Sequence, residues 1–429
     1  MQLGVGFGRR VCVIHLSPGI GRGNKGLTVS TTQSDYLHRG TAPYRRASIA
    51  LFCCGFATFA LLYCVQPLLP LFSAEFQVSP ATSSLAVSAA TVGVALSLIV
   101  VGVLSDRLGR KWMMAASQLL VVACTLGVAF APNWNALLAL RFLSGVALSG
   151  VPAVAMAYLA EEIEPESLGA VMGLYIAGNA MGGMAGRLLT GVLVDVTGSW
   201  RWAIALIAAI GLIAALTFIR LLPASKRFEA APAGRAAHHL KSIAALFREP
   251  TLPWIFGCGF LLMGGFVALF NVMSYRLVAA PFNLSNAAVG AIFLVYLIGA
   301  PVSAAFGSLS DRHGRAPMMA VATALMLLGL ALTLIDNLFA IVPGLAMITG
   351  GFFGAHAMAS AWAGSRVPSA RGQASSLYLF FYYLGPGIFG ALAGGLWTAH
   401  AWWGVAAMIG AMQLTLLAVV LLSPLRKAG

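Results

Sequence analysis

The sequence predicts an all-α membrane protein with twelve transmembrane helices, arranged as two halves of six. Hydrophobic residues make up 60% of the 429 residues and charged residues only 9%, with a mean hydropathy of +0.89. Soluble chains carry about 25% charged residues, so a soluble fold is excluded. A charged stretch also occurs twice, at 102–111 (GVLSDRLGRK) and 307–316 (GSLSDRHGRA), with the two aspartates 205 residues apart (311 − 106). A loop that recurs once per half indicates a duplicated helical bundle.

Twelve apolar runs follow one another along the chain, each near or above the roughly 20 residues that a helix needs to cross a bilayer. Proline, glycine and charged residues separate most of them. The predicted helices lie near residues 47–72, 82–105, 112–131, 134–159, 168–193, 200–221, 252–279, 286–308, 316–335, 338–364, 372–396 and 400–422.

The parts outside these helices are polar or short. Residues 1–46 are rich in Gly and Arg and contain no apolar run long enough for a signal peptide, so we expect a disordered tail. Residues 47–221 are the predicted N-terminal bundle, 222–251 a polar linker, 252–422 the C-terminal bundle and 423–429 a second tail.

The orientation in the membrane follows from the basic residues. We assign 22 of the 26 Lys and Arg residues to one side of the predicted helices. Cytoplasmic loops carry the excess of Lys and Arg, so both termini and the linker are expected in the cytoplasm. The basic residues that give the net charge of +14 are therefore explained by the orientation in the membrane, and we expect no nucleic-acid partner.

The duplication extends beyond the charged loops. Cys54-Gly55-Phe56 recurs as Cys258-Gly259-Phe260, 204 residues later (258 − 54). The tyrosine of Gly169…Leu174-Tyr175 recurs as Tyr378, an offset of 203 residues (378 − 175). Three separate helices share one offset, so the two halves are related to each other.

Several motifs together resemble a known family. They are the repeated G-x-L-S-D-R-x-G-R, the run 58–67 (TFALLYCVQP), the run 157–162 (AYLAEE), the run 372–379 (GQASSLYL) and Leu137-x3-Arg141-x2-Ser144-Gly145. From residue 36 to the C-terminus the chain resembles the major facilitator superfamily, in particular bacterial inner-membrane proteins of the arabinose-efflux-like, drug:proton antiporter type.

This resemblance implies the major facilitator fold, a multi-pass protein of the bacterial inner membrane, and transport by alternating access. It implies a monomer that exports a small organic solute, sugar- or drug-like and neutral or anionic, in exchange for protons. An importer or uniporter of a small metabolite is the alternative, and a non-transporting receptor or sensor is a rival of another class.

An enzyme is not expected, because the sequence contains no nucleophile–base pair, metal cluster or phosphate-binding loop. The six cysteines include no CxxC pair, and five of them lie in apolar runs. We therefore expect no cofactor, metal or disulfide. The expected partners are the solute, protons and the lipid bilayer.

The charged loops are the predicted conformational motif. Asp106 can cap the following helix, and Arg107 and Arg110 can pair with Glu161 or Glu162. Such pairs would latch the two halves together on the cytoplasmic face; the competing interpretation is a topology signal alone. The full set is Gly102, Asp106, Arg107, Gly109, Arg110, Glu161, Glu162, and in the second half Gly307, Asp311, Arg312, Gly314 and Arg315.

The fifth predicted helix carries two stripes. Gly178, Gly182 and Gly186 have the small-xxx-small spacing that brings two helix backbones together, so we expect them to pack against a neighbour. Asn179 and Arg187 lie on the next stripe and are expected to face inward.

Ionisable side chains within a span are costly and tend to face a cavity. Arg141, Arg187 and Arg276 lie in the periplasmic halves of their spans, and no carboxylate lies near mid-membrane. We expect Arg141 to face the cavity and attract neutral or anionic solutes, whereas Arg276 can snorkel to the interface. His356, deeper in its span, is either a proton carrier or an ordinary hydrogen-bonded histidine.

Polar and aromatic residues also form stripes on three further helices. The stripes are Tyr63 with Gln66, Asn271 with Tyr275, and Tyr378 with Tyr382. Nearby prolines loosen the helices, as is tolerated where the backbone lines a cavity. We expect these faces to line the substrate path, and core packing is the alternative for each residue.

Overall fold

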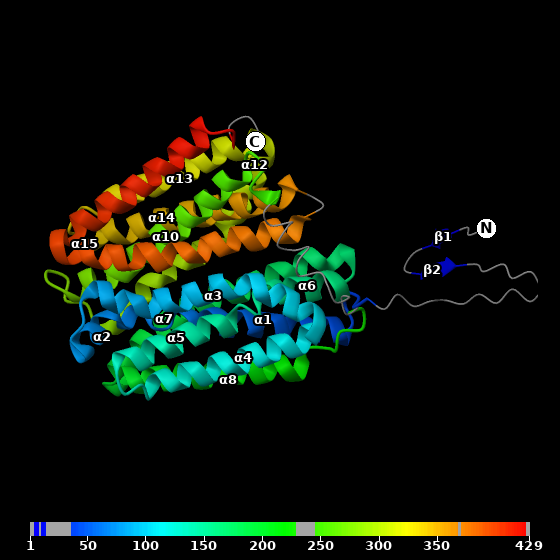
Figure 1. The fold of residues 1–429 in the computed structure, drawn as a ribbon, viewed down its shortest axis with the longest axis horizontal. Coiled ribbons are helices and arrows are strands. Elements are labelled where there is room, and N and C mark those ends of the chain that lie inside the picture. The colour runs from blue at the N-terminus through cyan, green and yellow to red at the C-terminus, as the bar shows by residue number, and fades with distance from the viewer. Residues whose placement is uncertain (1–3, 8–9, 14–35, 229–244, 368–369, 426–429) are drawn as a thin grey trace, which may run out of the picture.

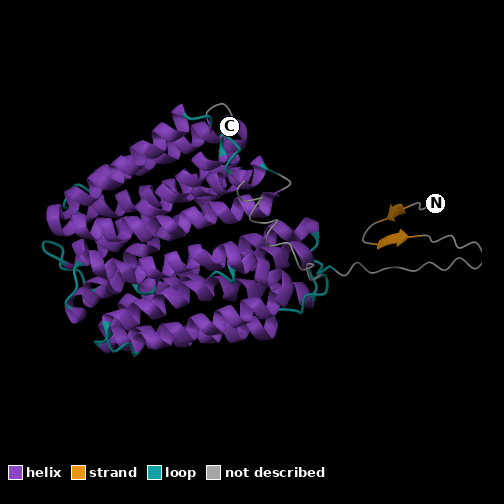
Figure 2. Ribbon diagram, viewed as in Figure 1, coloured by secondary structure: helices purple, strands orange, loops and turns teal. Residues whose placement is uncertain are grey.

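A computed structural model describes residues 4–7, 10–13, 36–228, 245–367 and 370–425, except for the side chains of 4–13, 99, 102–108 and 153. Two groups of helices lie side by side, with their long axes roughly parallel (Figure 1). Helices account for nearly all of the bundle (Figure 2), in agreement with the predicted all-α class.

The N-terminal half contains the helices from α1 to α8. Their bounds are α1 (Ala42–Tyr63), η1 (Gln66–Leu68), α2 (Leu69–Phe76), α3 (Pro80–Leu108), α4 (Arg110–Ala129), α5 (Trp134–Leu148), α6 (Pro152–Glu162), α7 (Pro165–Thr197) and α8 (Trp200–Leu221). Here α1, α7 and α8 pack together, and α4 packs against α5 and α8.

The C-terminal half contains the helices from α10 to α15. Their bounds are α10 (Leu252–Val278), α11 (Asn286–Ala291), η2 (Ile292–Ile298), α12 (Gly299–His313), α13 (Arg315–Leu332), α14 (Leu338–Arg366) and α15 (Arg371–Leu422). The halves meet where α3 packs against α15 and where α7 packs against α11 and η2.

Ten helices in the described part of the chain are long and apolar enough to cross a membrane. The last of them, α15, covers 52 residues and has non-helical backbone angles at His400 and Ala401. It is therefore two helices that meet at His400 and Ala401, and it contains both of the last two predicted spans. The fourth predicted span is divided into α5 and α6, so the count of twelve stays a prediction of the sequence.

The duplication is visible in the helix boundaries. The starts of α4 and α13 are 205 residues apart (315 − 110), and those of α5 and α14 are 204 apart (338 − 134). Both charged motifs place a glycine between two helices, with φ of +86° at Gly109 and +85° at Gly314. Glycine adopts positive φ without the steric cost that other residues meet, which explains its place in both copies.

Proline interrupts a different helix in each half. In the N-terminal half, α1 ends at Tyr63 and the chain continues through η1, which contains Pro67. In the C-terminal half, the stretch η2 has 3₁₀ geometry just before Pro301. Proline has no N–H and displaces the carbonyl four residues back, so both breaks have a local cause.

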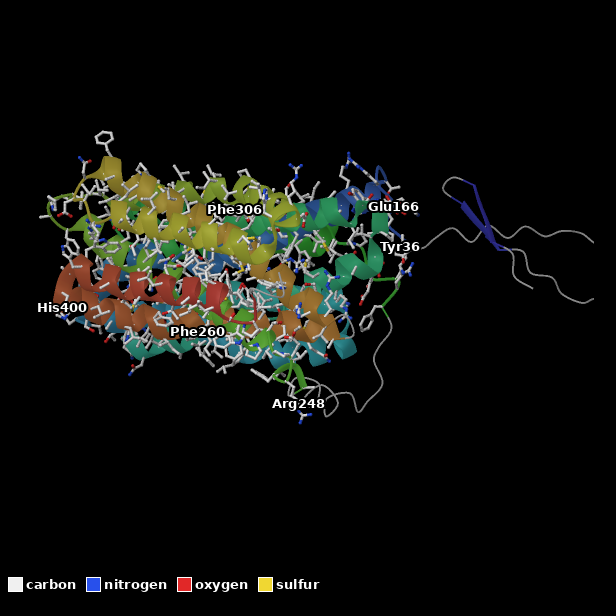
Figure 3. All side chains as sticks on the ribbon, turned by 90° about the horizontal axis from the view of Figure 1, so that it is seen from above. Tyr36, Glu166, Arg248, Phe260, Phe306 and His400 are labelled. Atoms are coloured by element: carbon white, nitrogen blue, oxygen red, sulfur yellow. The ribbon has the colours of Figure 1, made fainter. Side chains whose placement is uncertain are left out.

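The two ends of the bundle are distinguished by the residues that lie there. We call the end with Gly109, Glu161 and Glu164 the motif end, and the end with Glu75, Asp195 and Asp336 the opposite end. Figure 3 shows Tyr36, Glu166 and Arg248 at the motif end and His400 at the opposite end.

Between described residues, the bonds across the interface join Gln66 to Val267, Asn271 and Ser274, Tyr275 to Ser73 and Leu69, Ser88 to Pro386, and Asp195 to Asn286 and Ala287. None of them lies at the motif end. These bonds join the halves from the middle of the molecule to the opposite end.

The predicted disorder of residues 1–46 is partly wrong. Strands β1 (Gly4–Phe7) and β2 (Arg10–Val13) pair antiparallel, and α1 begins at Ala42 rather than near residue 47. Residues 36–41 are held in place because Leu37 forms a parallel bridge with Ile163. Residues 1–3, 8–9 and 14–35 lie outside the described chain.

Candidate functional site

A buried chain of hydrogen bonds crosses the interface between the halves. Arg187 on α7 donates from Nε to Oε1 of Gln66 on η1, at 2.6 Å. Gln66 in turn donates from Nε2 to Oδ1 of Asn271 on α10, at 2.8 Å. The break in α1 is what brings Gln66 between the other two side chains, because η1 contacts both α7 and α10. We call these three residues the relay.

The charge of Arg187 has no acidic partner within the described chain. Its Nη1 donates to the carbonyl of Gly183 at 2.6 Å. Its guanidinium carbon lies 4.2 Å from the ring centre of Tyr63, 4.8 Å from Phe293 and 5.0 Å from Tyr296. Aromatic faces stabilise a cation but do not neutralise it. The relay therefore carries a buried positive charge.

Several polar atoms near the interface are buried without a hydrogen-bond partner in the described structure. They include the hydroxyl of Tyr63, Nδ2 of Asn271, the hydroxyl of Tyr175 and Oδ1 of Asn179. Unpartnered buried polar groups cost about 1–3 kcal/mol each, so native proteins keep few of them. Of these residues, Tyr63 lies beside Arg187 and Asn271 belongs to the relay, so a ligand at the relay can complete both groups.

His356 on α14 lies in an aromatic cluster of the C-terminal half. Its Nδ1 is 2.9 Å from the hydroxyl of Tyr378, and its ring centre is 4.5 Å from that of Tyr382 and 5.9 Å from that of Phe352. No carboxylate contacts it in the described chain. This arrangement suits either a proton carrier or a packed histidine, so both interpretations stay open.

The prediction that Arg141 faces a cavity is wrong. Its Nε donates to the carbonyl of Ala86 at 2.9 Å, its Nη1 to that of Leu61 at 3.1 Å, and its Nη2 to that of Leu62. The last two carbonyls are those that α1 loses as helical acceptors where it breaks. Arg141 therefore closes the broken helix, and its donors are taken by the backbone.

Arg276 and Tyr275 also have defined partners. Arg276 has partners within the protein: it donates to Asp336 at 2.7 Å and to the carbonyl of Thr333 at 2.6 Å. The hydroxyl of Tyr275 lies 2.6 Å from that of Ser73 and 2.8 Å from the carbonyl of Leu69. Tyr275 thus joins the halves near the opposite end.

The predicted ion pair between Arg110 and Glu161 is present, but it joins two helices of the same half, and a latch between the halves stays a prediction. The two side chains lie 2.8 Å apart, on α4 and α6 of the N-terminal half. Glu162 accepts bonds from the Ser225 hydroxyl and from two backbone N–H groups of residues 226 and 227. The predicted roles of Asp106, Arg107 and Gly102 lie outside the described side chains.

In the second copy of the motif, the arginine contacts a hydroxyl group instead of a carboxylate. Arg315 donates to the hydroxyl of Ser365 at 2.8 Å, and Ser365 stands 204 residues after Glu161 (365 − 161). Asp311 and Arg312 are exposed, and the structure shows no side-chain bond from either within the described residues. Gly307 has open space around it.

The glycine stripe of α7 lies directly on α1. A Cβ added to Gly178, Gly182 or Gly186 would approach a carbonyl oxygen of α1 to 2.4, 2.1 or 2.6 Å. Such distances leave no room for a side chain, so the two backbones pack as the spacing predicts. Asn179, on the neighbouring stripe, packs against Gly55 rather than joining the relay.

Residues 36–39 form a strap across the motif end. Oε2 of Glu164 lies 2.6 Å from Nδ1 of His38, and Oε1 accepts the Arg39 backbone N–H at 2.7 Å. The bond from Arg39, together with those from His38 and Ser167, lowers the pKa of Glu164 to about 2. The sequence analysis did not single out Glu164.

The sequence analysis also missed Phe293 and Tyr296, which cover Arg187 from the other half. Their spacing of three residues, directly before Gly299 and Pro301, is the signal that could have identified them. A 3₁₀ stretch places side chains three apart on the same face, so both rings point toward α7. No group of three or more potential metal ligands occurs in the part of the chain that the structure describes.

Comparison with known proteins identifies relatives over most of the chain. The sequence profile of the Major Facilitator Superfamily matches residues 51–277 and 255–429. The inner membrane transport protein YnfM of Escherichia coli is 45% identical over 386 residues, which cover 90% of this chain and 92% of that protein. The uncharacterized MFS-type transporter YybF of Bacillus subtilis is 43% identical and covers 89% and 94%.

Solved structures support the fold. The nucleoside transporter NupG superposes with a TM-score of 0.70 at 14% identity, covering 87% of this chain and 98% of that structure. The D-xylose-proton symporter gives a TM-score of 0.67 at 15% identity, covering 87% and 96%. At such identities the likeness concerns the fold alone.

Proposed function

Because the chain belongs to the major facilitator superfamily and is a secondary transporter of the membrane, we propose that it exports a small organic solute by proton-coupled alternating access. The proposed solute is neutral or anionic. The observation that carries the proposal is the buried, uncompensated charge of Arg187 at the interface between the halves. In a low-dielectric interior such a charge attracts anions and repels lipophilic cations.

The relay offers a way to couple binding to the interface. A solute anion at Arg187 competes with Oε1 of Gln66 for the guanidinium. Once released, Gln66 no longer has a fixed position from which to donate to Asn271. We propose that binding thereby weakens the contact between the halves and allows the opposite end to open. A ligand shifts such an equilibrium only through different affinities for the two states, which this competition provides.

The proposed orientation places the motif end in the cytoplasm of a bacterial inner membrane. It rests on the distribution of the Lys and Arg residues. A single cysteine at Arg248, in a cysteine-free background, is expected to resist a membrane-impermeant maleimide in intact cells. One at Asn283, an exposed loop residue, is expected to react; reversed labelling would contradict the orientation.

Transport in proteoliposomes tests the role of Arg187. Arg187→Gln removes the charge and is expected to lower the uptake of anionic solutes about tenfold to a hundredfold, as the loss of charge-assisted hydrogen bonds predicts. Arg187→Lys keeps the charge but loses the planar fork, so an intermediate value is expected. The proposal would be contradicted if both variants transported anionic solutes as well as the unchanged protein does, or if a lipophilic cation were the preferred solute.

His356 is the proposed proton carrier. His356→Gln is expected to keep the solute bound but to abolish solute-driven acidification or alkalinisation of the vesicle lumen, reported by a trapped pH dye. Tyr378→Phe removes only the hydroxyl that contacts Nδ1 and serves as the matched control for packing. If His356→Gln retains full proton movement, the histidine is an ordinary packed residue and coupling lies elsewhere.

A further inference from the structure

The interior of the described bundle contains three arginines, and two of them are already satisfied. Arg141 gives its donors to three backbone carbonyls. Arg276 is paired with Asp336. Arg187 has no acidic partner among the described residues, and its Nη2 makes no hydrogen bond there. Arg187 therefore presents a positive charge with an open donor at the interface between the halves.

The guanidinium of Arg187 is open at its edge. A guanidinium carries five N–H donors, and the structure shows two hydrogen bonds from this one, at Nε and Nη1. Nη2 has no partner in the described chain. The rings of Tyr63, Phe293 and Tyr296 surround the group, with centres 4.2 to 5.0 Å from its central carbon, so the open Nη2 is the place where an acceptor can bind. A carboxylate or sulfonate binds a guanidinium in that plane, with two oxygens toward two N–H groups.

A continuous series of aromatic rings begins at Arg187 and leads into the C-terminal half. The ring centre of Tyr296 is 5.5 Å from that of Phe266, and Phe266 is stacked on Phe352 at 3.8 Å with an angle of 7°. Phe352 is parallel to His356 at 6°, and His356 lies 4.5 Å from Tyr382. All of these rings are on α10, η2, α14 and α15, so they stay together when the halves separate.

We propose that the solute of this transporter is an aromatic organic monoanion, with its acidic group on Arg187 and its ring against the aromatic series that starts at Tyr296. The proposal rests on the proposed function and specifies its substrate class. A monoanion neutralises the single charge, whereas a dianion leaves one negative charge buried and a neutral solute leaves the positive charge uncompensated. Stacking and edge-to-face contacts with the series add about 0.5–1.5 kcal/mol per ring pair beyond burial, which favours a flat ring over a saturated one.

Four simple probes separate charge from ring. The full-length protein in nanodiscs is titrated with benzenesulfonate, benzenesulfonamide, cyclohexanesulfonate and 1,3-benzenedisulfonate, and binding is measured by calorimetry and by thermal shift. The sulfonates stay charged over the whole accessible pH range and do not cross the bilayer. Benzenesulfonate is expected to bind at least about tenfold more tightly than each of the other three. Equal or tighter binding of the sulfonamide, the saturated ring or the dianion would overturn the proposal.

Two variants test the two ends of the site. Arg187→Gln is expected to weaken benzenesulfonate by about tenfold or more and to leave benzenesulfonamide unchanged. Tyr296→Leu is expected to weaken benzenesulfonate while leaving cyclohexanesulfonate unchanged, so that the preference for the ring disappears. Arg248→Gln removes an exposed arginine outside the bundle and serves as the matched control, with no change for any probe. Unchanged benzenesulfonate affinity in a folded Arg187→Gln protein would place the anion elsewhere and overturn the proposal.

Transport distinguishes failure of the substrate class from failure of the proposed function. Proteoliposomes are loaded with each probe, and efflux is measured with and without an imposed proton gradient. If cyclohexanesulfonate or benzenesulfonamide moves faster than benzenesulfonate, the substrate class is wrong and the export function stands. If benzenesulfonate binds through Arg187 but no probe moves, the substrate class stands and the export function fails.

Discussion

The first helix of the N-terminal half is broken, whereas its counterpart in the C-terminal half is continuous. Pro67 stands in the break after α1, and the position 204 residues later (271 − 67) is Asn271, in the middle of the unbroken α10. Arg141 closes the break, and the position 204 residues after it (345 − 141) is Leu345. The arginine is present where carbonyls have lost their helical donors and absent where they have not. A buried arginine is therefore not by itself evidence of a ligand.

Arg187 makes the opposite point. With the offset of 203 residues that relates α7 to α15, the matching position (390 − 187) is Gly390, so the second half has no equivalent charge. Arg187 donates to one side chain and one carbonyl and keeps further donors. Two arginines in the same bundle thus have different tasks, one structural and one at the interface.

The largest expected effect comes from replacing Arg141 by leucine, the residue at the matching position of the C-terminal half. Arg141→Leu removes a buried donor from three carbonyls, and the carbonyls of Leu61 and Leu62 are those at the break in α1. An unsatisfied buried group costs about 1–3 kcal/mol. We expect a loss of several kcal/mol in the free energy of unfolding, seen as poor insertion or a large fall in the melting temperature. Leu345→Met, a volume-conserving change at the matching place, is the control. A normally stable Arg141→Leu protein would refute the structural role.

The second prediction changes the relay without removing Arg187. Gln66→Glu places a carboxylate beside the Nε of Arg187, where Gln66 Oε1 now lies at 2.6 Å. The internal pair neutralises the charge, so we expect uptake of anionic solutes to fall more than about tenfold while the protein stays folded. Uptake of neutral solutes is the comparison, measured in the same vesicles. Retained anion transport would show that the positive charge is not what attracts the solute.

The third prediction exchanges the motif contacts of the two halves. Glu161→Ser copies Ser365 and removes a partly exposed ion pair, so a loss of about 0.5–1 kcal/mol is expected. Ser365→Glu gives Arg315 an acidic partner and is expected to recover a similar amount in the double variant. Thermal unfolding in detergent measures both. Because the pair lies within one half, transport is expected to change less than stability; the reverse result would support a latch between the halves.

The smallest effect concerns the strap. Glu164 has a pKa of about 2, below its ordinary value of 4.5, because it accepts the Arg39 N–H and contacts His38 and Ser167. A lowered pKa means that the contact contributes fully above pH 4.5 and is lost as the pH falls toward 2. The protection factor of the Arg39 amide in hydrogen exchange is expected to fall over this range. Glu164→Gln should remove the pH dependence; an unchanged pH profile would contradict the assignment.

The C-terminal half also holds the start of its first helix through a carboxylate. Here the carboxylate lies on the segment before the first helix, and its basic partner lies at the end of another helix. Glu249, just before α10, accepts from Arg366 at the end of α14. Burial raises the pKa of Glu249, but hydrogen bonds from Thr251, Leu252 and Arg366 outweigh it and leave the pKa lowered. Each half thus fixes its first helix at the motif end through one carboxylate.

The apolar spans, the duplication and the glycines at close contacts and positive φ could be predicted from the sequence. Apolar composition acts additively over about 20 residues, so the membrane helices can be recognised from local sequence. The positive φ at Gly109 and Gly314 and the close approach at Gly182 are likewise fixed by the absence of a Cβ. These features need no knowledge of what lies across the bundle.

The partners of the buried polar residues could not be predicted from the sequence, because they come from distant parts of the chain. Arg141 finds its carbonyls 55 to 80 residues away, and Gln66 reaches Asn271 across 205 residues. A pattern in one helix cannot tell whether the donors of an arginine are taken by a neighbour's backbone or remain open. That depends on where a distant helix breaks, and for this reason Arg141 and Arg187 look alike in the sequence and differ in the folded protein.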